Sequence, residues 1–416
     1  MKLEIGFGST PQTVEIPDKN LIGVLKPNDI HVDIKGVSSV ESALQNPIGS
    51  KKLSDIANPG EKTVIITSDV TRPVPSNKII PAVLAELEKA GVNFGEITVV
   101  FALGSHRKHT PDEMKTLVGD EVYGKVLCID GDPNDFVHMG TTMLGTPVDI
   151  TRVVAEADRR IGIGNIEYHY FAGYSGGAKA IMPGVSTRAA IQNNHSRMVL
   201  PEAAAGRLEG NPVREDIEEA MKYCPLDFIV NVVLDEHKET IYTVAGDAVL
   251  AHREGCKFLD QIYLKTIADR ADIVIASQGG APKDLNLYQT QKALDNAKHA
   301  VKDGGIIILV GSCKEGLGEE VFENWLLSAK KSKDLVERIG RDFQLGGHKA
   351  AAIAMVLEDA DIYLVSDMAP DFVENIFMKP YATVQNALDA AFEKLGKNAT
   401  VLVMPYGGST LPVVKQ

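Results

Sequence analysis

The chain has 416 residues, 44% of them hydrophobic, and a formal net charge of −13. A chain of this length and composition can bury the cores of two ordinary domains. The acidic balance disfavours nucleic acid as a partner, because proteins that bind nucleic acid usually present a basic face. The longest apolar runs, such as residues 306–310, are the size of a strand, so we expect no membrane span.

Cysteine usage and the N-terminal segment both indicate the cytoplasm. The four cysteines form neither a C-x-x-C pair nor an evident disulfide framework, which fits a reducing compartment. Residues 1–17 alternate like a β-hairpin with its turn at residues 8–11, and they contain no apolar signal core. We therefore predict a cytoplasmic protein.

Strand and helix patterns alternate through the first part of the chain. The β-branched run at residues 63–67 is typical of a buried parallel strand, and residues 97–102 predict the next one. A helix pattern lies between them, and Thr110 followed by Pro111 predicts the N-cap of another helix. Further elements are predicted at residues 160–166 (strand), 186–222 (helices broken at Asn211 and Pro212), 228–234 and 239–245 (antiparallel strands) and roughly 247–266 (helix).

The same alternation restarts near residue 271. It predicts strands at 272–276, 305–310, 361–365 and 400–404, and helices near 289–302, 319–332, 348–357 and 383–395. Alternation of this kind favours an α/β fold with two α/β domains and mainly parallel sheets. We place the domains at residues 1–266 and 267–416.

The stretch from His169 to His195 is the strongest candidate for a functional site. Lys179 follows Gly176 and Gly177, so little side-chain bulk screens its ammonium group. A lysine presented in this way is typical of a covalent or phosphate-binding group. A P-loop would require Gly-Lys-Ser/Thr, but alanines flank this lysine, which disfavours an NTPase.

Other polar groups follow the predicted strands directly. Asp69 and Arg72 come after the first strand, His106 after the next, and His169 after the third. Ligands of such sheets lie outside the carboxyl ends of the strands, so we expect these loops to meet at one edge. Two loop histidines can supply the proton acceptor and donor that a racemase needs, although a single histidine of this kind is more often structural.

The chain resembles the nickel-pincer lactate racemase family of 2-hydroxy-acid racemases and epimerases. The residues that carry the resemblance are His169, the run GYSGGAK ending at Lys179, the Met-Pro-Gly turn at 182–184, and His195. The resemblance covers essentially the whole chain in order. It implies an N-terminal domain that binds the cofactor and performs catalysis, a C-terminal domain that contributes substrate-binding residues, and an active-site cleft between the two.

The family also implies a cofactor, a nickel pincer nucleotide (pyridinium-3,5-bisthiocarboxylic acid mononucleotide nickel). Lys179 would attach it covalently, and His195 would be the protein ligand of Ni(II), a ligand set of sulfur and imidazole that suits this metal. Gly176, Gly177 and Thr187 are expected to bind its phosphate through backbone N–H groups. Partners would be a small 2-hydroxy acid and the cofactor-maturation enzymes; the oligomeric state stays open.

The resemblance assigns the remaining site residues as well. His106 and His169 would be the acid/base pair, and Asp69 and Arg72 would lie near the substrate. Tyr288, Gln289 and Lys292 would bind the substrate from the C-terminal domain, although Gln289 and Lys292 alone could equally be one face of a surface helix.

Several alternatives remain open from the sequence. Lys179 could instead serve a Schiff-base or pyridoxal enzyme, or the chain could be a non-catalytic carrier of a metal or nucleotide. A dehydrogenase using free NAD is less favoured because no G-x-G-x-x-G opens a helix after a strand. Lactate-type members of the family place a tryptophan against the substrate, but the single tryptophan here, Trp325, has no evident place there. The 345–349 loop could line the pocket instead. The substrate could therefore be a 2-hydroxy acid larger than lactate.

Overall fold

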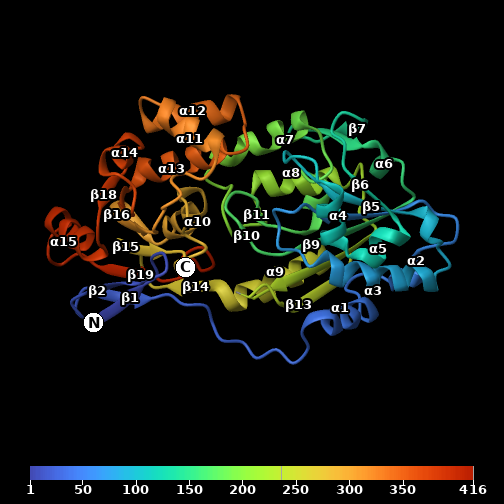
Figure 1. Cartoon of the computed structure of the whole chain (residues 1–416), viewed down its shortest axis with the longest axis horizontal. Coiled ribbons are helices and arrows are strands. Elements are labelled where there is room, and N and C mark those ends of the chain that lie inside the picture. The colour runs from blue at the N-terminus through green and yellow to red at the C-terminus, as the bar shows by residue number, and fades with distance from the viewer. Residues whose placement is uncertain (236, 416) are drawn as a thin grey trace. The chain divides into compact units, whose positions relative to one another are not determined.

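The structure, a computed structural model, describes residues 1–235 and 237–415. The chain divides into two compact units. Unit 1 comprises Met1–Asp29 and Ile262–Gln416, and unit 2 comprises Ile30–Gln261. Each is a mixed α/β assembly around a mainly parallel sheet, which confirms the predicted fold class (Figure 1).

Unit 2 is built on a six-stranded sheet with the order β13-β12-β9-β4-β5-β6. Strands β12 to β6 run parallel, and β13 is antiparallel to β12. Two short hairpins, β7–β8 and β10–β11, complete its strands. The strands are β4 (Thr63–Ser68), β5 (Ile97–Ala102), β6 (Leu127–Asp130), β7 (Phe136–Thr141), β8 (Pro147–Thr151), β9 (Arg159–Asn165), β10 (Tyr168–His169), β11 (Gly173–Tyr174), β12 (Phe228–Leu234) and β13 (Thr240–Gly246).

Helices pack their apolar sides against this sheet. Ile79 and Val83 of α3, for example, are fully buried in one cluster with Ile65 of β4 and Val99 of β5. Burial on both faces explains why β4 is an uninterrupted β-branched run. The helices are α1 (Gly36–Gln45), α2 (Leu53–Ile56), α3 (Ser76–Lys89), η1 (Phe94–Glu96), α4 (Pro111–Val118), α5 (Asp120–Lys125), α6 (Arg152–Ala155), η2 (Gly177–Ala180), α7 (Arg188–His195), η3 (Ser196–Val199), α8 (Pro212–Ala220) and α9 (Leu250–Tyr263), where η denotes a 3-10 turn.

Unit 1 contains a second six-stranded sheet, which is wholly parallel and has the order β18-β17-β16-β15-β19-β3. Helix α15 and the β1–β2 hairpin share a buried apolar cluster with this sheet. Its strands, with those of the small pairs β1–β2 and β14–β20, are β1 (Lys2–Ile5), β2 (Gln12–Glu15), β3 (Leu21–Val24), β14 (Leu264–Ile267), β15 (Ala271–Ser277), β16 (Val301–Val310), β17 (Asp361–Val365), β18 (Lys379–Tyr381), β19 (Val401–Met404) and β20 (Leu411–Val414).

The helices of unit 1 follow the strands much as the sequence predicts. They are α10 (Leu287–Ala297), α11 (Glu320–Ser328), α12 (Ser332–Arg341), α13 (Gly347–Asp359), α14 (Pro370–Asn375) and α15 (Val384–Leu395). Helices α12 and α14 were not predicted. Within the described residues, no helix is both long and apolar enough to cross a membrane.

The N-terminal segment differs from the predicted domain division. We expected one continuous domain from residue 1 to residue 266, but residues 1–29 belong to unit 1. The reason is long-range pairing: β3 adds to the edge of the unit 1 sheet beside β19, and Ser277 Oγ donates to the carbonyl of Gly6 at 2.6 Å. Local sequence patterns contain no signal for such a partner.

Asn211 and Pro212 also differ from their predicted role. They do not interrupt a helix; they begin one. Asn211 is the N-cap of α8, its side chain accepts hydrogen bonds from the N–H groups of Val213 and Arg214, and Pro212 occupies the first turn. Helix α7 ends earlier, at His195.

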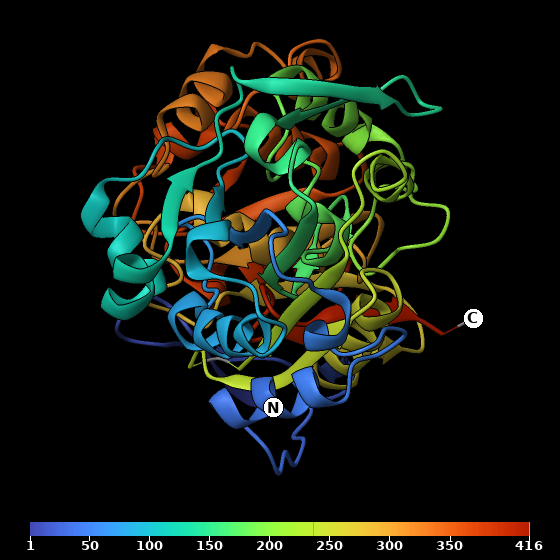
Figure 2. The ribbon, with the colours of Figure 1, turned by 90° about the vertical axis from the view of Figure 1, so that its right-hand side faces the viewer.

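The β7–β8 hairpin was likewise absent from the predicted elements. Figure 2, which views the chain from a second side, shows it in blue-green at the margin of unit 2. Its tip is anchored to the body of the unit, because Tyr223 donates through its hydroxyl group to the carbonyl of Thr141. The hairpin is therefore a fixed part of unit 2.

Candidate functional site

Four predicted site residues follow three adjacent strands of the unit 2 sheet. Strands β9, β4 and β5 are parallel neighbours, so their carboxyl ends share one edge. Asp69 and Arg72 follow β4, His106 follows β5, and His169 lies in the hairpin after β9. The prediction that these loops meet at one edge of the sheet is confirmed.

His106 is paired with the buried carboxylate of Asp69. Its Nδ1 hydrogen bonds to Asp69 Oδ2, while Asp69 Oδ1 accepts from the N–H and hydroxyl groups of Thr71. Burial acts to raise the pKa of Asp69, but the hydrogen bonds from His106 and Thr71 outweigh it, so the net pKa is lowered. An ionised carboxylate can only accept a hydrogen bond, so Nδ1 of His106 carries the hydrogen. The lone pair of the neutral imidazole is therefore at Nε2.

A second histidine holds the loop that carries Asp69. His109 Nε2 accepts from the N–H of Val70 at 3.0 Å, and its Nδ1 lies 2.6 Å from Asp130 Oδ1. His109 is buried against Phe101. It therefore has a structural role, which is to position the Asp69 loop.

Lys179 lies in a short 3-10 turn whose glycines admit no side chain. A Cβ at Gly177 would lie 2.9 Å from the ring of His252, and one at Gly176 would lie 2.7 Å from Asn231 Oδ1; both glycines have positive φ. The loop therefore presses against β12 and α9 in a conformation that L side chains rarely adopt. This close approach explains the Gly-Gly sequence before Lys179.

A network of buried polar side chains forms hydrogen bonds with the backbone of the same loop. Arg214 donates to the carbonyl of Tyr174, and His252 Nε2 lies 2.8 Å from the carbonyl of Ser175. Arg214 also bonds to Glu218 and to Nδ1 of His252. Burial, followed by the charge of Arg214, lowers the pKa of His252 well below its usual value, so it is neutral and can donate at Nε2 while accepting at Nδ1.

The pKa of the Lys179 amine is shifted by its surroundings. Burial is the largest cause, and the nearby charges of Arg72 and Arg214 add to it; Glu167 opposes them. Together they lower the pKa of Lys179 well below its usual 10.5. A neutral amine is a nucleophile, whereas an ammonium ion is not, so this lowering of the pKa favours the nucleophilic form of Lys179.

This pKa predicts how the stability of the cofactor-free protein depends on pH. Unfolding restores the ordinary pKa, so below 10.5 the unfolded chain takes up a proton that the folded chain does not hold, which disfavours folding. Lys179→Met removes this cost. Calorimetry of the variant should show a higher Tm than the wild type at about pH 6, and the gain should shrink toward about pH 9.

Lys115→Met is the control for that experiment, because Lys115 lies at the surface in an ion pair with Asp120. Its Tm should not show the same pH-dependent gain. A Tm difference for Lys179→Met that is absent, or that grows with pH, would contradict the neutral amine.

Three predicted site residues meet around the buried ring of Phe171. The ring centroid lies 4.5 Å from that of His169 and 4.9 Å from that of His195, both edge-on, and 5.9 Å from Lys179 Nζ. Asn211 fixes the phenylalanine from behind by donating to its carbonyl at 2.9 Å. Residues separated by 26 positions in the sequence are thus gathered in one place.

His195 and Thr187 occupy the two ends of α7. Thr187 caps the helix by accepting from the N–H of Ala190, and its own N–H and hydroxyl groups donate to Asp149. At the other end, His195 is buried, and its Nδ1 lies 2.8 Å from Oδ1 of Asn194. The helix therefore carries the predicted metal ligand at its C-terminal end.

The predicted phosphate-binding groups already have partners within the protein. The N–H of Gly177 donates to Asn231 Oδ1 at 2.7 Å, and the N–H of Thr187 donates to the carbonyl of Asp149 at 3.2 Å. Gly176 serves mainly to let the loop approach Asn231. In the structure, Gly176 and Gly177 allow the shape of the loop, and Thr187 caps the helix. A phosphate-binding role for these three residues stays a prediction.

Tyr288, Gln289 and Lys292 lie on α10 of unit 1, as the helix pattern predicts. Asn286 caps this helix by accepting from the N–H of Gln289. Gln289 is half-buried and Lys292 is exposed, so the two share the outward side of the helix, one turn apart. The amide and the ammonium group are thus placed to act together.

Trp325 and Lys349, the last residue of the 345–349 loop, both pack within unit 1. Lys349 belongs to the first turn of α13, and its Nζ lies 3.9 Å above the ring of Tyr288 and bonds to the tyrosine carbonyl. Trp325 is buried in α11, donates to Gln344 and stacks under Arg338. It is a core residue of unit 1.

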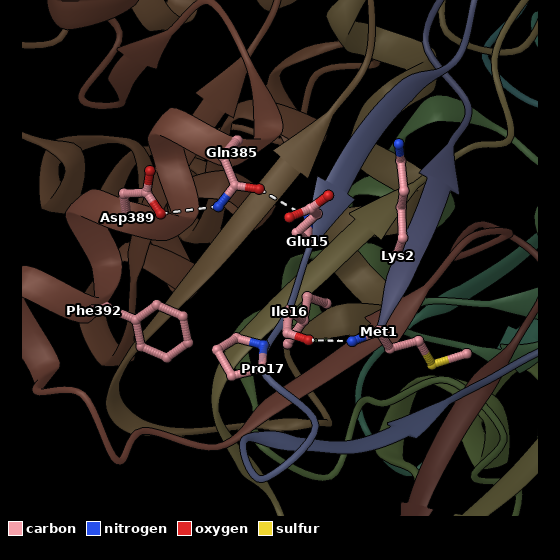
Figure 3. A pocket seen from close by; sticks show the side chains of 8 residues that line it. All are labelled: Met1, Lys2, Glu15, Ile16, Pro17, Gln385, Asp389 and Phe392. Atoms are coloured by element: carbon pink, nitrogen blue, oxygen red, sulfur yellow. Dashed lines mark hydrogen bonds between the residues drawn. The ribbon is translucent and has the colours of Figure 1, made fainter.

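A pocket elsewhere in unit 1 contains none of the predicted site residues. It lies between the β1–β2 hairpin and α15, where Gln385 bonds to Glu15 and Asp389 (Figure 3). Within the described residues, no group of three or more His, Cys, Asp or Glu side chains could hold a metal ion.

Sequence reasoning missed several residues of this site. Phe171, Asn194, Arg214 and His252 all contact a predicted site residue or its loop. Phe171 and Asn194 lie within the 169–195 stretch, so their position was a usable signal. Arg214 and His252 lie on separate helices, and only long-range packing brings them to the loop.

Comparison with known proteins gives a consistent result along the chain. A family model of the lactate racemase N-terminal domain matches residues 7–206, and one of the lactate racemase C-terminal domain matches residues 266–412. A lactate racemase from Thermoanaerobacterium thermosaccharolyticum is 35% identical over 421 residues, covering 98% of each chain. A lactate racemase from Lactiplantibacillus plantarum is 34% identical over 417 residues, covering 97% of this chain and 98% of its own.

Solved structures agree with the fold. The lactate racemase apoprotein from T. thermosaccharolyticum superposes with a TM-score of 0.89 at 33% identity, covering all of both chains. A protein from Thermotoga maritima matches with a TM-score of 0.65 at 17% identity, covering 92% of this chain and all of that one, which shows similarity of fold alone.

Proposed function

Because the chain belongs to the lactate racemase family, we propose that it racemises or epimerises a 2-hydroxy acid by reversible hydride transfer. Membership of the family makes the chain an isomerase. One observation carries the proposal for this site: His169, His195 and Lys179, whose pKa is lowered by burial, surround the ring of Phe171 at the carboxyl edge of the unit 2 sheet.

We propose that Lys179 covalently holds the nickel pincer nucleotide and that His195 is its protein ligand. The residues fit the group: burial lowers the pKa of the Lys179 amine, which favours its nucleophilic form, and the His195 imidazole contacts the same aromatic ring as the amine. When bound, the cofactor supplies a reversible acceptor for the hydrogen on C2 of the substrate. Cofactor-maturation enzymes would have to supply it.

The two other imidazoles are proposed to handle the hydroxyl proton. His106 carries a lone pair at Nε2 because Asp69 occupies Nδ1, so it can accept the proton. His169 Nδ1 accepts from the N–H of Ala172 at 3.3 Å, so its neutral form carries a hydrogen at Nε2 and can donate a hydrogen bond to the substrate oxygen. When the hydrogen returns to C2, His106 gives the proton back to the substrate oxygen, so both imidazoles end the turnover in the forms in which they began it.

Arg72 and the α10 residues are proposed to bind the carboxylate. Arg72 is exposed beside the Asp69 loop, and a guanidinium group matches the two oxygens of a carboxylate. Tyr288, Gln289 and Lys292 would add a phenol, an amide and a cation. These groups would keep the planar keto acid bound until it takes the hydrogen back on its other face.

The test is made on protein coexpressed with the cofactor-making enzymes. Intact mass and metal analysis should show a covalent adduct at Lys179 with about one nickel ion, and polarimetry on a panel of single-enantiomer 2-hydroxy acids should show loss of rotation. Protein without an adduct or nickel that racemises nothing in the panel would refute the proposal.

One observation also favours a second candidate. A lysine whose pKa is lowered by burial, as that of Lys179 is, is what a Schiff-base enzyme requires. A Schiff-base enzyme would form an adduct that borohydride reduction traps, and it would be active without nickel. The same protein sample therefore distinguishes the two candidate functions.

A further inference from the structure

His195 is the last residue of α7, and the asparagine before it, Asn194, has a side-chain amide that is hydrogen-bonded at both ends. Asn194 is fully buried. Its Nδ2 donates to the carbonyl of Val213 at 3.1 Å and to Asp216 Oδ2 at 2.7 Å, and its Oδ1 lies 2.8 Å from His195 Nδ1. The amide therefore has partners at both ends.

These partners determine which way the amide faces. The carbonyl of Val213 can only accept, so the nitrogen of Asn194 must point toward it and the oxygen must point toward His195. An amide oxygen cannot donate, so Nδ1 of His195 must carry a hydrogen. Because a neutral imidazole has one N–H group, the lone pair of His195 is then at Nε2.

Asp216 is itself held independently of the asparagine. Its side chain is fully buried, and it accepts from the hydroxyl groups of Thr142 and Thr146, the latter at 2.6 Å. Both threonines belong to the loop of the β7–β8 hairpin. The carboxylate is therefore fixed by a separate element and orients the Asn194 amide from there.

We propose that Asn194 and Asp216 are positioning residues for the metal ligand. They hold His195 in the Nδ1–H tautomer, so that Nε2 presents its lone pair to the metal. The inference rests on the proposed function, in which His195 binds nickel. Ligating histidines commonly donate their other N–H group to a fixed acceptor, and loss of that acceptor typically weakens metal binding about 10–100-fold.

The first test needs no cofactor. In the full-length apoprotein labelled with ring-¹⁵N histidine, long-range ¹H–¹⁵N correlation reports the tautomer of each imidazole, and His195→Gln assigns the His195 signals. The wild type should show the Nδ1–H form. Asn194→Ala should shift the signals toward the other tautomer; Asp216→Ala should do so too, and Asp216→Asn, which keeps an acceptor oxygen, should restore them.

Asn193→Ala is the matched control. Asn193 lies one position earlier on the same helix and accepts from Thr146 and Arg197, but it has no hydrogen bond to His195 among those the structure describes. Asn193→Ala and Asn194→Ala should both lower the Tm, whereas only Asn194→Ala should change the tautomer. A purely structural role for Asn194 predicts no such difference.

The second test measures nickel in the loaded protein. During dialysis against a chelator, Asn194→Ala should lose nickel about 10–100-fold faster than the wild type, with the Lys179 adduct still present by intact mass. Wild-type protein that never binds nickel would refute the proposed function. If the wild-type protein binds nickel but Asn194→Ala changes neither the His195 tautomer nor the retention of nickel, this inference alone is overturned.

Discussion

Replacement of Lys179 by alanine is expected to abolish covalent cofactor attachment and to reduce racemisation to background. The proposal gives the cofactor one nucleophile, the Lys179 amine, whose pKa is lowered by burial, and alanine has no such group. Intact mass of protein coexpressed with the maturation enzymes should equal the bare chain, and polarimetry should show no turnover.

Lys125→Ala is a matched control for this experiment. Lys125 is an exposed lysine of the same unit, in an i,i+4 ion pair with Glu121 on α5, and such pairs contribute little to stability. It should keep the full adduct and the full rate. An adduct of unchanged mass on Lys179→Ala would show that another residue carries the cofactor.

Replacement of His106 by alanine is expected to lower kcat by about 10²–10⁴-fold while the adduct and its nickel remain. The variant loses the imidazole that accepts the hydroxyl proton but touches neither Lys179 nor His195 among the described contacts. Asp69→Asn should cause a smaller loss in the same parameter, because the imidazole loses its charged partner but remains in place. Rates with both enantiomers, together with metal analysis, measure these effects.

His138→Ala provides the control, because His138 forms a similar pair with Asp149 in the same unit but has a side chain that is 55% exposed. Its rate should stay close to that of the wild type. A full rate in His106→Ala would remove His106 from the acid/base pair, and nickel loss in that variant would show that His106 contributes to the metal site instead.

The residues of the site were predictable to different degrees. Asp69, His106 and His169 follow strands whose β-branched runs are plain in the sequence, and parallel strands place such loops at one edge. The helix with Gln289 and Lys292 was predictable from its period. The phosphate role of Gly177 and Thr187 was not testable from spacing, because a pattern does not reveal that their N–H groups donate to Asn231 and Asp149.

The sequence by itself determined the alternation of strands and helices, the glycine turn before Lys179 and the order of the site loops, because each depends on neighbours within a few positions. Only the tertiary structure decided which imidazole nitrogen carries a hydrogen, since Asp69, Ala172 and Asn194 make that choice through hydrogen bonds. It also decided that Arg214 lies close enough to lower the pKa of Lys179, and that residues 1–29 join the sheet of unit 1. Those outcomes depend on partners brought together by packing over long sequence distances, which periodicity and composition do not encode.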